Sequence, residues 1–143
     1  MLQLTGFWMA LATFLGIWWG HVGVRWLERT VTRLAPPATI LTVMGLGLNL
    51  YALFAPGLTV AGVCSIIGIT LLWDAHELFR QQRRVFKGHA PANPRNPRHA
   101  AHLTATGHAT TANLLDREPT GCPVLPRPTS SALGTTANAT KHQ

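Results

Sequence analysis

Five titratable side chains border the apolar stretches of the chain. They are His21, Glu28, Asp74, His76 and Glu77. Imidazole and carboxylate groups carry protons and bind metal ions or haem, and they are costly to place in lipid without a partner. His21 and Asp74 lie at similar depth if their two helices run in the same direction, and the other three lie about a turn further in. We therefore expect these five groups to gather at one end of a helix bundle.

Two interpretations of this polar cluster are open. The first is a proton-relay, metal or haem site that uses His21 and His76. The second is a set of interfacial residues that pair with water and with Arg25, Arg29 and Arg80. We favour the second, because charges are tolerated at interfacial depth and two histidines on different helices do not form a coordination motif. The sequence also has no phosphate-binding loop, dinucleotide fingerprint, HExxH motif or nucleophile elbow, so we predict no catalytic residue, no bound metal and no cofactor.

Membrane-spanning helices are predicted to position these groups. Hydrophobic residues make up 47% of the 143 residues and charged residues only 12%, about half the ~25% that is usual in soluble proteins. Residues 1–24 and 34–73 contain no Asp, Glu, Lys or Arg. We predict spans at about residues 5–24, 38–55 and 58–75. The first helix should stop near Pro36-Pro37, since proline lacks the amide donor. The predicted fold class is an all-α membrane protein with three transmembrane helices.

The basic residues predict how these spans are oriented. Arg25, Arg29 and Arg33 follow the first span, whereas the predicted turn at Pro56-Gly57 has no charge, and basic residues again follow the third span. Because cytoplasmic loops carry an excess of Lys and Arg, we predict the amino terminus outside and the carboxyl terminus inside. We expect a multi-pass protein of the bacterial inner membrane. We interpret the net charge of +7 as a signal that orients the spans in the membrane, so nucleic acid is not an expected partner.

The third helix is predicted to continue into the cytoplasm as an amphipathic extension to residue 87. One face of it carries aromatic and basic side chains, namely Trp73, Arg80, Arg83, Arg84 and Lys87. Such a face suits anionic phospholipid headgroups or a protein partner. It suits equally well a stop-transfer flank that only fixes topology, and both interpretations are open.

Small residues recur along the predicted spans, including Gly16, Gly20, Gly62 and Gly68. Small residues let helices approach closely in lipid, either within one bundle or between copies of a chain. We favour packing within the bundle, because three spans must first pack together. Asn49 and Ser65 are expected to form hydrogen bonds between helices.

The composition changes after Gly88, where the chain becomes rich in Ala, Thr, Pro, Asn and His without apolar periodicity. Such a segment buries too little apolar surface to offset the loss of chain entropy on folding. We therefore predict a membrane domain over residues 1–95 and a disordered cytoplasmic tail over residues 96–143.

Two groups of short motifs are distinctive. The first span contains Ala12-Thr13-Phe14-Leu15-Gly16, His21 and Glu28. The later stretches are Leu72-Trp73, Glu77-Leu78-Phe79, Gln82, Arg84-Val85, Lys87-Gly88 and Pro91-Ala92-Asn93-Pro94-Arg95. These motifs resemble a bacterial family known as domain of unknown function 4491. The resemblance covers about residues 5–95. It implies a small multi-pass membrane protein and supplies no activity.

Together these features predict a membrane protein that is not an enzyme. We expect a non-enzymatic accessory or interaction subunit with a basic cytoplasmic face. Its expected partners are the lipid bilayer and either another membrane protein or copies of itself. The alternative is a small transport or redox component with a proton, metal or haem site at the cytoplasmic mouth of the bundle.

Overall fold

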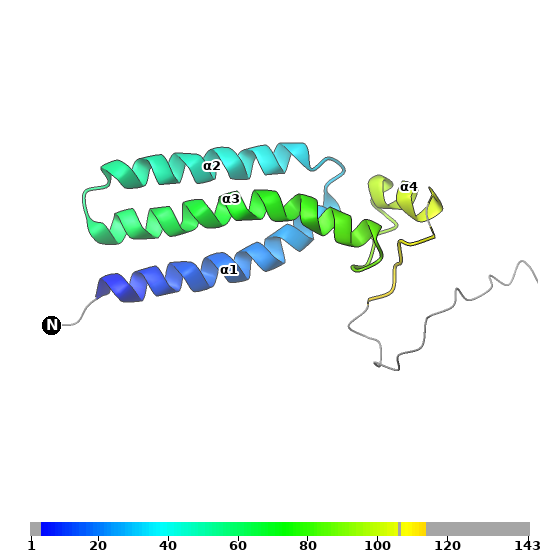
Figure 1. Ribbon diagram of the computed structural model, residues 1–143, viewed down its shortest axis with the longest axis horizontal. Coiled ribbons are helices and arrows are strands. Elements are labelled where there is room, and N and C mark those ends of the chain that lie inside the picture. Colours follow the sequence, from blue (N-terminus) through cyan, green and yellow to red (C-terminus); the bar gives the residue numbers. More distant parts are fainter. Residues whose placement is uncertain (1–3, 106, 114–143) are drawn as a thin grey trace, which may run out of the picture.

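The fold is a bundle of three long helices with a short fourth helix at one end (Figure 1). The computed structural model describes residues 4–105 and 107–113. In order, these residues form α1 (Leu4–Thr30), α2 (Ala35–Phe54), α3 (Leu58–Phe86) and α4 (Pro97–Ala105). The first three are long and apolar enough to cross a membrane, so the predicted all-α fold with three candidate spans is confirmed.

The helix boundaries correct one detail of the prediction. Pro36 and Pro37 do not end the first helix, because α1 already ends at Thr30 and the prolines lie in the first turn of α2. Proline suits that position, since the amide hydrogen it lacks would have no helical acceptor there. At 29 residues, α3 is about 43 Å long. It ends at Phe86, which agrees with the predicted extension to residue 87.

Helix α3 lies between α1 and α2 and packs against both (Figure 1). The two outer helices approach each other only near the loop that joins them. There Val24 of α1, Leu34 of the loop, Ala38 of α2 and Leu78 of α3 form a buried apolar cluster. Towards its amino terminus, α1 diverges from α2 and keeps contact with α3 through a Thr5–Thr59 hydrogen bond of 2.8 Å.

Glycines bring α1 and α3 together. A Cβ atom built on Gly16 would lie 3.2 Å from the Thr70 side chain, and one built on Gly62 would overlap the Met9 side chain. A Cβ at Gly20 would overlap the Asp74 carboxylate. These three glycines therefore face the neighbouring helix of the same chain.

The α2–α3 contact combines glycines with a polar pair. A Cβ on Gly45 would lie 2.7 Å from the Gly68 carbonyl oxygen, so the two backbones meet closely here. Next to this contact, the Ser65 hydroxyl donates a hydrogen bond of 3.3 Å to Asn49 Oδ1, and Asn49 Nδ2 donates to the Gly45 carbonyl at 2.8 Å. The predicted interhelical hydrogen bond between Asn49 and Ser65 is thus confirmed.

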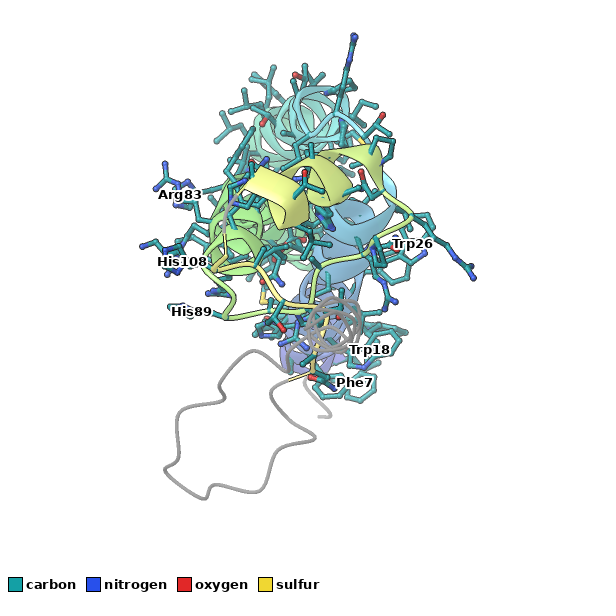
Figure 2. All side chains as sticks on the ribbon, turned by 90° about the vertical axis from the view of Figure 1, so that its right-hand side faces the viewer. Phe7, Trp18, Trp26, Arg83, His89 and His108 are labelled. Carbon is teal, nitrogen blue, oxygen red and sulfur yellow. The ribbon has the colours of Figure 1, made fainter. Side chains whose placement is uncertain are left out.

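Most large apolar side chains of the spans point outward. Phe7, Trp18 and Trp26 project from α1 on one side of the bundle (Figure 2) and are 60%, 55% and 64% exposed. Burial within the spans is confined to the stripes where helices meet. A lipid environment would cover these outward faces.

The predicted tail contains ordered structure, which corrects the boundary placed at residue 96. Helix α3 ends in a Schellman motif: Gly88 has a φ of +76°, its N–H bonds the Val85 carbonyl, and the His89 N–H bonds the Arg84 carbonyl. The chain then turns back, and Ala90, Ala92 and Leu103 pack against Val85. The His102 ring stacks on Phe86, with centroids 3.9 Å apart. The rest of the predicted tail, residues 114–143, lies outside the described residues.

Replacing Gly45 with alanine is expected to separate α2 from α3 and to lower the free energy of unfolding in mixed micelles by about 1–3 kcal/mol. The reason is the 2.7 Å approach that the new Cβ would make to the Gly68 carbonyl. Gly47→Ala, two residues along the same helix, meets nothing within 4 Å. This control should leave stability unchanged or raise it slightly. Equal effects of the two substitutions would contradict the packing described here.

Candidate functional site

The charged residues of the described chain gather at the α4 end of the bundle. The first charged residue is Arg25, near the end of α1, and none occurs between Leu34 and Trp73. The opposite end, with the start of α1 and the α2–α3 turn, is therefore uncharged over the described residues (Figure 1). We call the part formed by residues 25–34 and 74–105 the charged end.

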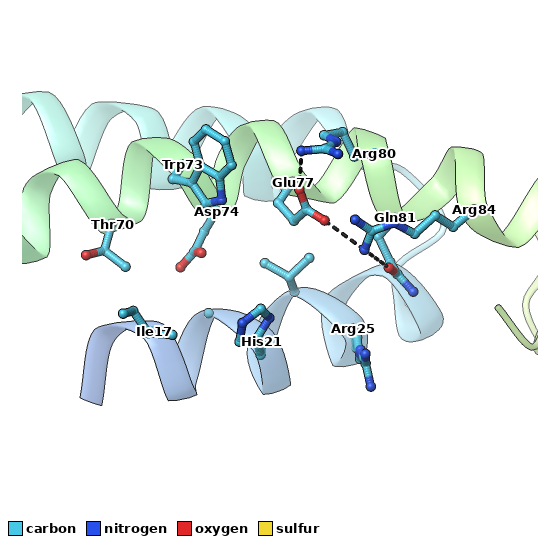
Figure 3. A pocket seen from close by; sticks show the side chains of 12 residues that line it. Ile17, His21, Arg25, Thr70, Trp73, Asp74, Glu77, Arg80, Gln81 and Arg84 are labelled. Atoms are coloured by element: carbon cyan, nitrogen blue, oxygen red, sulfur yellow. Dashed lines mark hydrogen bonds and ion pairs between the residues drawn. The ribbon is translucent and has the colours of Figure 1, made fainter. Parts of the chain in front are cut away.

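Three of the five titratable groups singled out from the sequence share one cleft. It has a volume of about 340 Å³ and lies between α1 and α3, with His21, Asp74 and Glu77 among its lining residues (Figure 3). Asp74 is 7% exposed because its carboxylate lies against the backbone of Gly20, where any larger residue would displace it. The absence of a side chain on α1 thus creates the space for an acid on α3.

Glu77 is held by two arginines of its own helix. Its carboxylate oxygens lie 3.5 Å from Arg80 Nη1 and 2.9 Å from Arg84 Nη1 (Figure 3). Arg84 also donates to Gln81 Oε1 at 3.2 Å. The predicted basic face is therefore divided: Arg80 and Arg84 are paired, whereas the exposed Arg83 and Lys87 form no ion pair with a described residue.

His76 lies outside the cleft, contrary to the expectation that all five groups would meet. It is exposed, and its ring lies beside that of Trp73, with centroids 5.9 Å apart. His21 and His76 therefore do not face a common site. Among the described residues, no group of three His, Cys, Asp or Glu side chains is placed to hold a metal ion.

Glu28, the fifth group, belongs to a different and more deeply buried arrangement. It is only 2% exposed, although it lies near the end of α1. Its Oε1 atom lies 3.1 Å from Arg98 Nη2 and 2.8 Å from His99 Nε2, both on α4. His99 itself is fully buried. The carboxylate therefore joins two helices that are about 70 residues apart in sequence.

The hydrogen bonds of His99 define its protonation. Its Nδ1 atom accepts a hydrogen bond of 2.9 Å from the Asn93 backbone N–H, so Nδ1 carries no proton. The ring proton is then on Nε2, which donates it to Glu28. A histidine in this arrangement is neutral. The positive charge that balances Glu28 comes from Arg98.

The same segment supplies donors to the carboxyl-terminal end of α1. Asn93 Nδ2 donates to the Arg29 carbonyl at 3.0 Å, and Asn96 Nδ2 donates to the carbonyls of Arg29 and Val31 at 3.2 and 3.0 Å. Arg98 Nη2 donates to the Glu28 carbonyl at 2.5 Å. The last carbonyls of a helix lack helical donors. Residues 93–98 provide those donors from elsewhere in the chain.

Asn96 connects α1 and α4 directly. While its amide nitrogen donates to α1, its Oδ1 accepts a hydrogen bond of 3.1 Å from the Arg98 N–H and so caps the start of α4. Pro97 follows as the first residue of that helix. Asn followed by Pro is a recognisable helix-start signal, which the prediction of a disordered tail does not take into account.

Comparison with known proteins identifies the family of this chain. A family model described as domain of unknown function (DUF4491) matches residues 3–96, so the predicted family is confirmed. The match includes Glu28, Asn93 and Asn96, and it ends just before Arg98 and His99. No curated protein and no solved structure matches the chain.

Replacing Glu28 with glutamine is expected to lower the free energy of unfolding by about 3–5 kcal/mol, since it leaves the Arg98 charge buried without its counter-charge. Arg98 tolerates this poorly, because its Nε and Nη1 atoms are already buried without a hydrogen-bond partner among the described residues. Unfolding in mixed micelles, followed by circular dichroism, measures the change.

The matched control is Glu77→Gln, which removes an acid that pairs with two half-exposed arginines. We expect this substitution to cost no more than about 1 kcal/mol. A Glu28 variant as stable as the Glu77 variant would show that the buried network contributes little.

Proposed function

We propose that this chain, which belongs to the DUF4491 family, is a non-enzymatic accessory or interaction subunit of the bacterial inner membrane. In this proposal the three long helices span the bilayer with the amino terminus outside. The charged end faces the cytoplasm and presents basic side chains there. The partner is another membrane protein or a second copy of the chain.

The observation that carries the proposal is the small contact between the two outer spans, α1 and α2. Because α3 lies between α1 and α2, the outer helices cover little of each other, and their outward faces are apolar along most of their length. The aromatic face of α1 includes Phe7, Trp18, Trp19 and Trp26. Rigid aromatic side chains of this kind are favoured at protein interfaces. This face is therefore the surface that we assign to a partner in the membrane.

The contacts of Glu28 and Glu77 support a non-enzymatic function. Glu28 is fixed by Arg98 and His99, and Glu77 is fixed by Arg80 and Arg84. These contacts hold the charged end together, and they occupy groups that a catalytic site would need to be accessible. The redox or transport alternative is weakened because His21, which lines the α1–α3 cleft, and the exposed His76 do not share a site.

The distribution of basic residues supports the orientation. Arg25, Arg29 and Arg33 lie at the same end of the bundle as the basic residues of α3 (Figure 1). An excess of Lys and Arg in short flanking segments is retained on the cytoplasmic side.

Reporter fusions test this orientation. A reporter inserted at the Pro56-Gly57 turn is expected to report the periplasm, and one placed after Gly107 is expected to report the cytoplasm. The two sites lie at opposite ends of the bundle (Figure 1). If both reporters gave the same compartment, the proposed three-span topology would be refuted.

Co-purification tests the interaction role. The tagged full-length chain, extracted in a mild detergent, is expected to bring down a membrane protein in stoichiometric amount or to elute as an oligomer of itself. Replacing Trp18 and Trp19 with alanine should weaken the complex by about 2 kcal/mol or more, since exposed tryptophans at an interface act as binding hot spots. As a control, Val43→Ala trims an exposed side chain of α2. A clean monomer without a partner would contradict the proposal.

A further inference from the structure

A second cavity lies at the charged end, beyond the α1–α3 cleft. It has a volume of about 440 Å³ and is enclosed by the end of α1, the last turns of α3 and the segment that follows Gly88. Its lining residues are Arg25, Glu28, Arg29, Gln81, Arg84, His89, Ala90, Pro91 and Asn113. We call it the arginine cavity.

Within the described residues, the positive charges around the arginine cavity are not balanced by acidic side chains. Glu28 is the only acid among the described residues that line it, and its carboxylate is already engaged by Arg98 and His99. Arg84 pairs with Glu77, whereas Arg25 and Arg29 form no ion pair with a described residue. Arg25 and Arg29 lie one helical turn apart on α1 and line the same cavity. Such a cavity attracts an anion, and guanidinium groups match the oxygens of a phosphate.

The arginine cavity adjoins the α1–α3 cleft, which leads towards the apolar part of the bundle. It shares Arg25, Gln81 and Arg84 with the α1–α3 cleft, which continues along α1 to Ile17 and along α3 to Thr70. An anionic group in the cavity can therefore be attached to an apolar chain that lies along the cleft. A free phosphate has no apolar chain that could occupy the α1–α3 cleft.

The depth of the cavity also fits a membrane surface. Arg25 and Arg29 directly follow the uncharged stretch of α1, and Trp26 between them is exposed. Tryptophan prefers the level of the headgroups. The cavity would thus lie where the phosphates of the inner leaflet lie.

We propose that the arginine cavity binds the phosphate of an anionic phospholipid, with Arg25 and Arg29 as its principal ligands. The inference rests on the proposed function in one respect, namely that the spans cross a bilayer. It assigns the headgroup to α1, and not to Arg83 and Lys87 on the exposed face of α3.

The test uses the full-length chain in detergent, titrated with short-chain phosphatidylglycerol and followed by native mass spectrometry. We expect one tightly bound lipid per chain. Arg25→Gln combined with Arg29→Gln is expected to weaken this binding roughly 30-fold, at about 1 kcal/mol for each basic residue lost. Arg25→Lys with Arg29→Lys keeps the charge and should retain most of the affinity, which guards against a loss of fold.

The matched control is Arg83→Gln combined with Lys87→Gln, which removes the same charge from the same end of the bundle. Neither residue lines the arginine cavity, and Arg83 projects from the side opposite Trp26 (Figure 2). Lipid binding should stay within about threefold of the unmodified chain. An equal loss in both double variants would overturn the proposal in favour of a diffuse attraction to the basic surface.

Two further titrations identify the source of the phosphate. Zwitterionic phosphatidylcholine should bind much more weakly than phosphatidylglycerol, and equal binding would overturn the assignment to an anionic lipid. Inorganic phosphate should not displace the lipid at equal concentration, and if it did, the site would be one for free phosphate. Because these measurements use the isolated chain, they are independent of whether a protein partner co-purifies.

Discussion

The charged end depends on the interaction of the buried Glu28 carboxylate with Arg98 and His99. A charge near the end of a helix is normally exposed, but here it is covered by α4 and balanced by Arg98, with His99 donating a second hydrogen bond to the same oxygen. Removing a charge from water is costly unless its partners are well placed. The arrangement therefore persists only while residues 93–99 stay on α1.

This contact determines the shape of the rest of the charged end. The chain turns back after Gly88, and Asn93 and Asn96 reach the open carbonyls of α1. Since the segment is attached at one side to α3 and at the other to α1, it holds these two helices together beyond the membrane-spanning part. The α1–α3 cleft and the arginine cavity both lie along this junction, and Arg25, Gln81 and Arg84 line both.

The sequence predicts the spans well and the charged end incompletely. Three uncharged stretches, separated by the basic residues at 25–33 and by Pro56-Gly57, define three helices. Polar side chains within the spans form the expected hydrogen bond, as Asn49 and Ser65 show. The pairing of Glu28 with Arg98 and His99 cannot be predicted from the sequence pattern, because it depends on how the chain turns at Gly88. Residues 97–105 also have little apolar periodicity, so composition favours disorder, whereas capping by Asn96 and burial of His99 stabilise a helix. The family resemblance includes Pro91-Ala92-Asn93-Pro94-Arg95, but it does not predict that this segment donates hydrogen bonds to the end of α1.

A double-mutant cycle between Glu28 and Arg98 tests the central claim most directly. The free energies of unfolding of Glu28→Ala, Arg98→Ala and the double variant are measured in the same mixed micelles. If the two side chains form a buried pair, the double variant is less destabilised than the sum of the single variants, with a coupling energy of about 1–3 kcal/mol. Additivity within about 0.5 kcal/mol would mean that residues 93–99 are not held on α1 by this carboxylate.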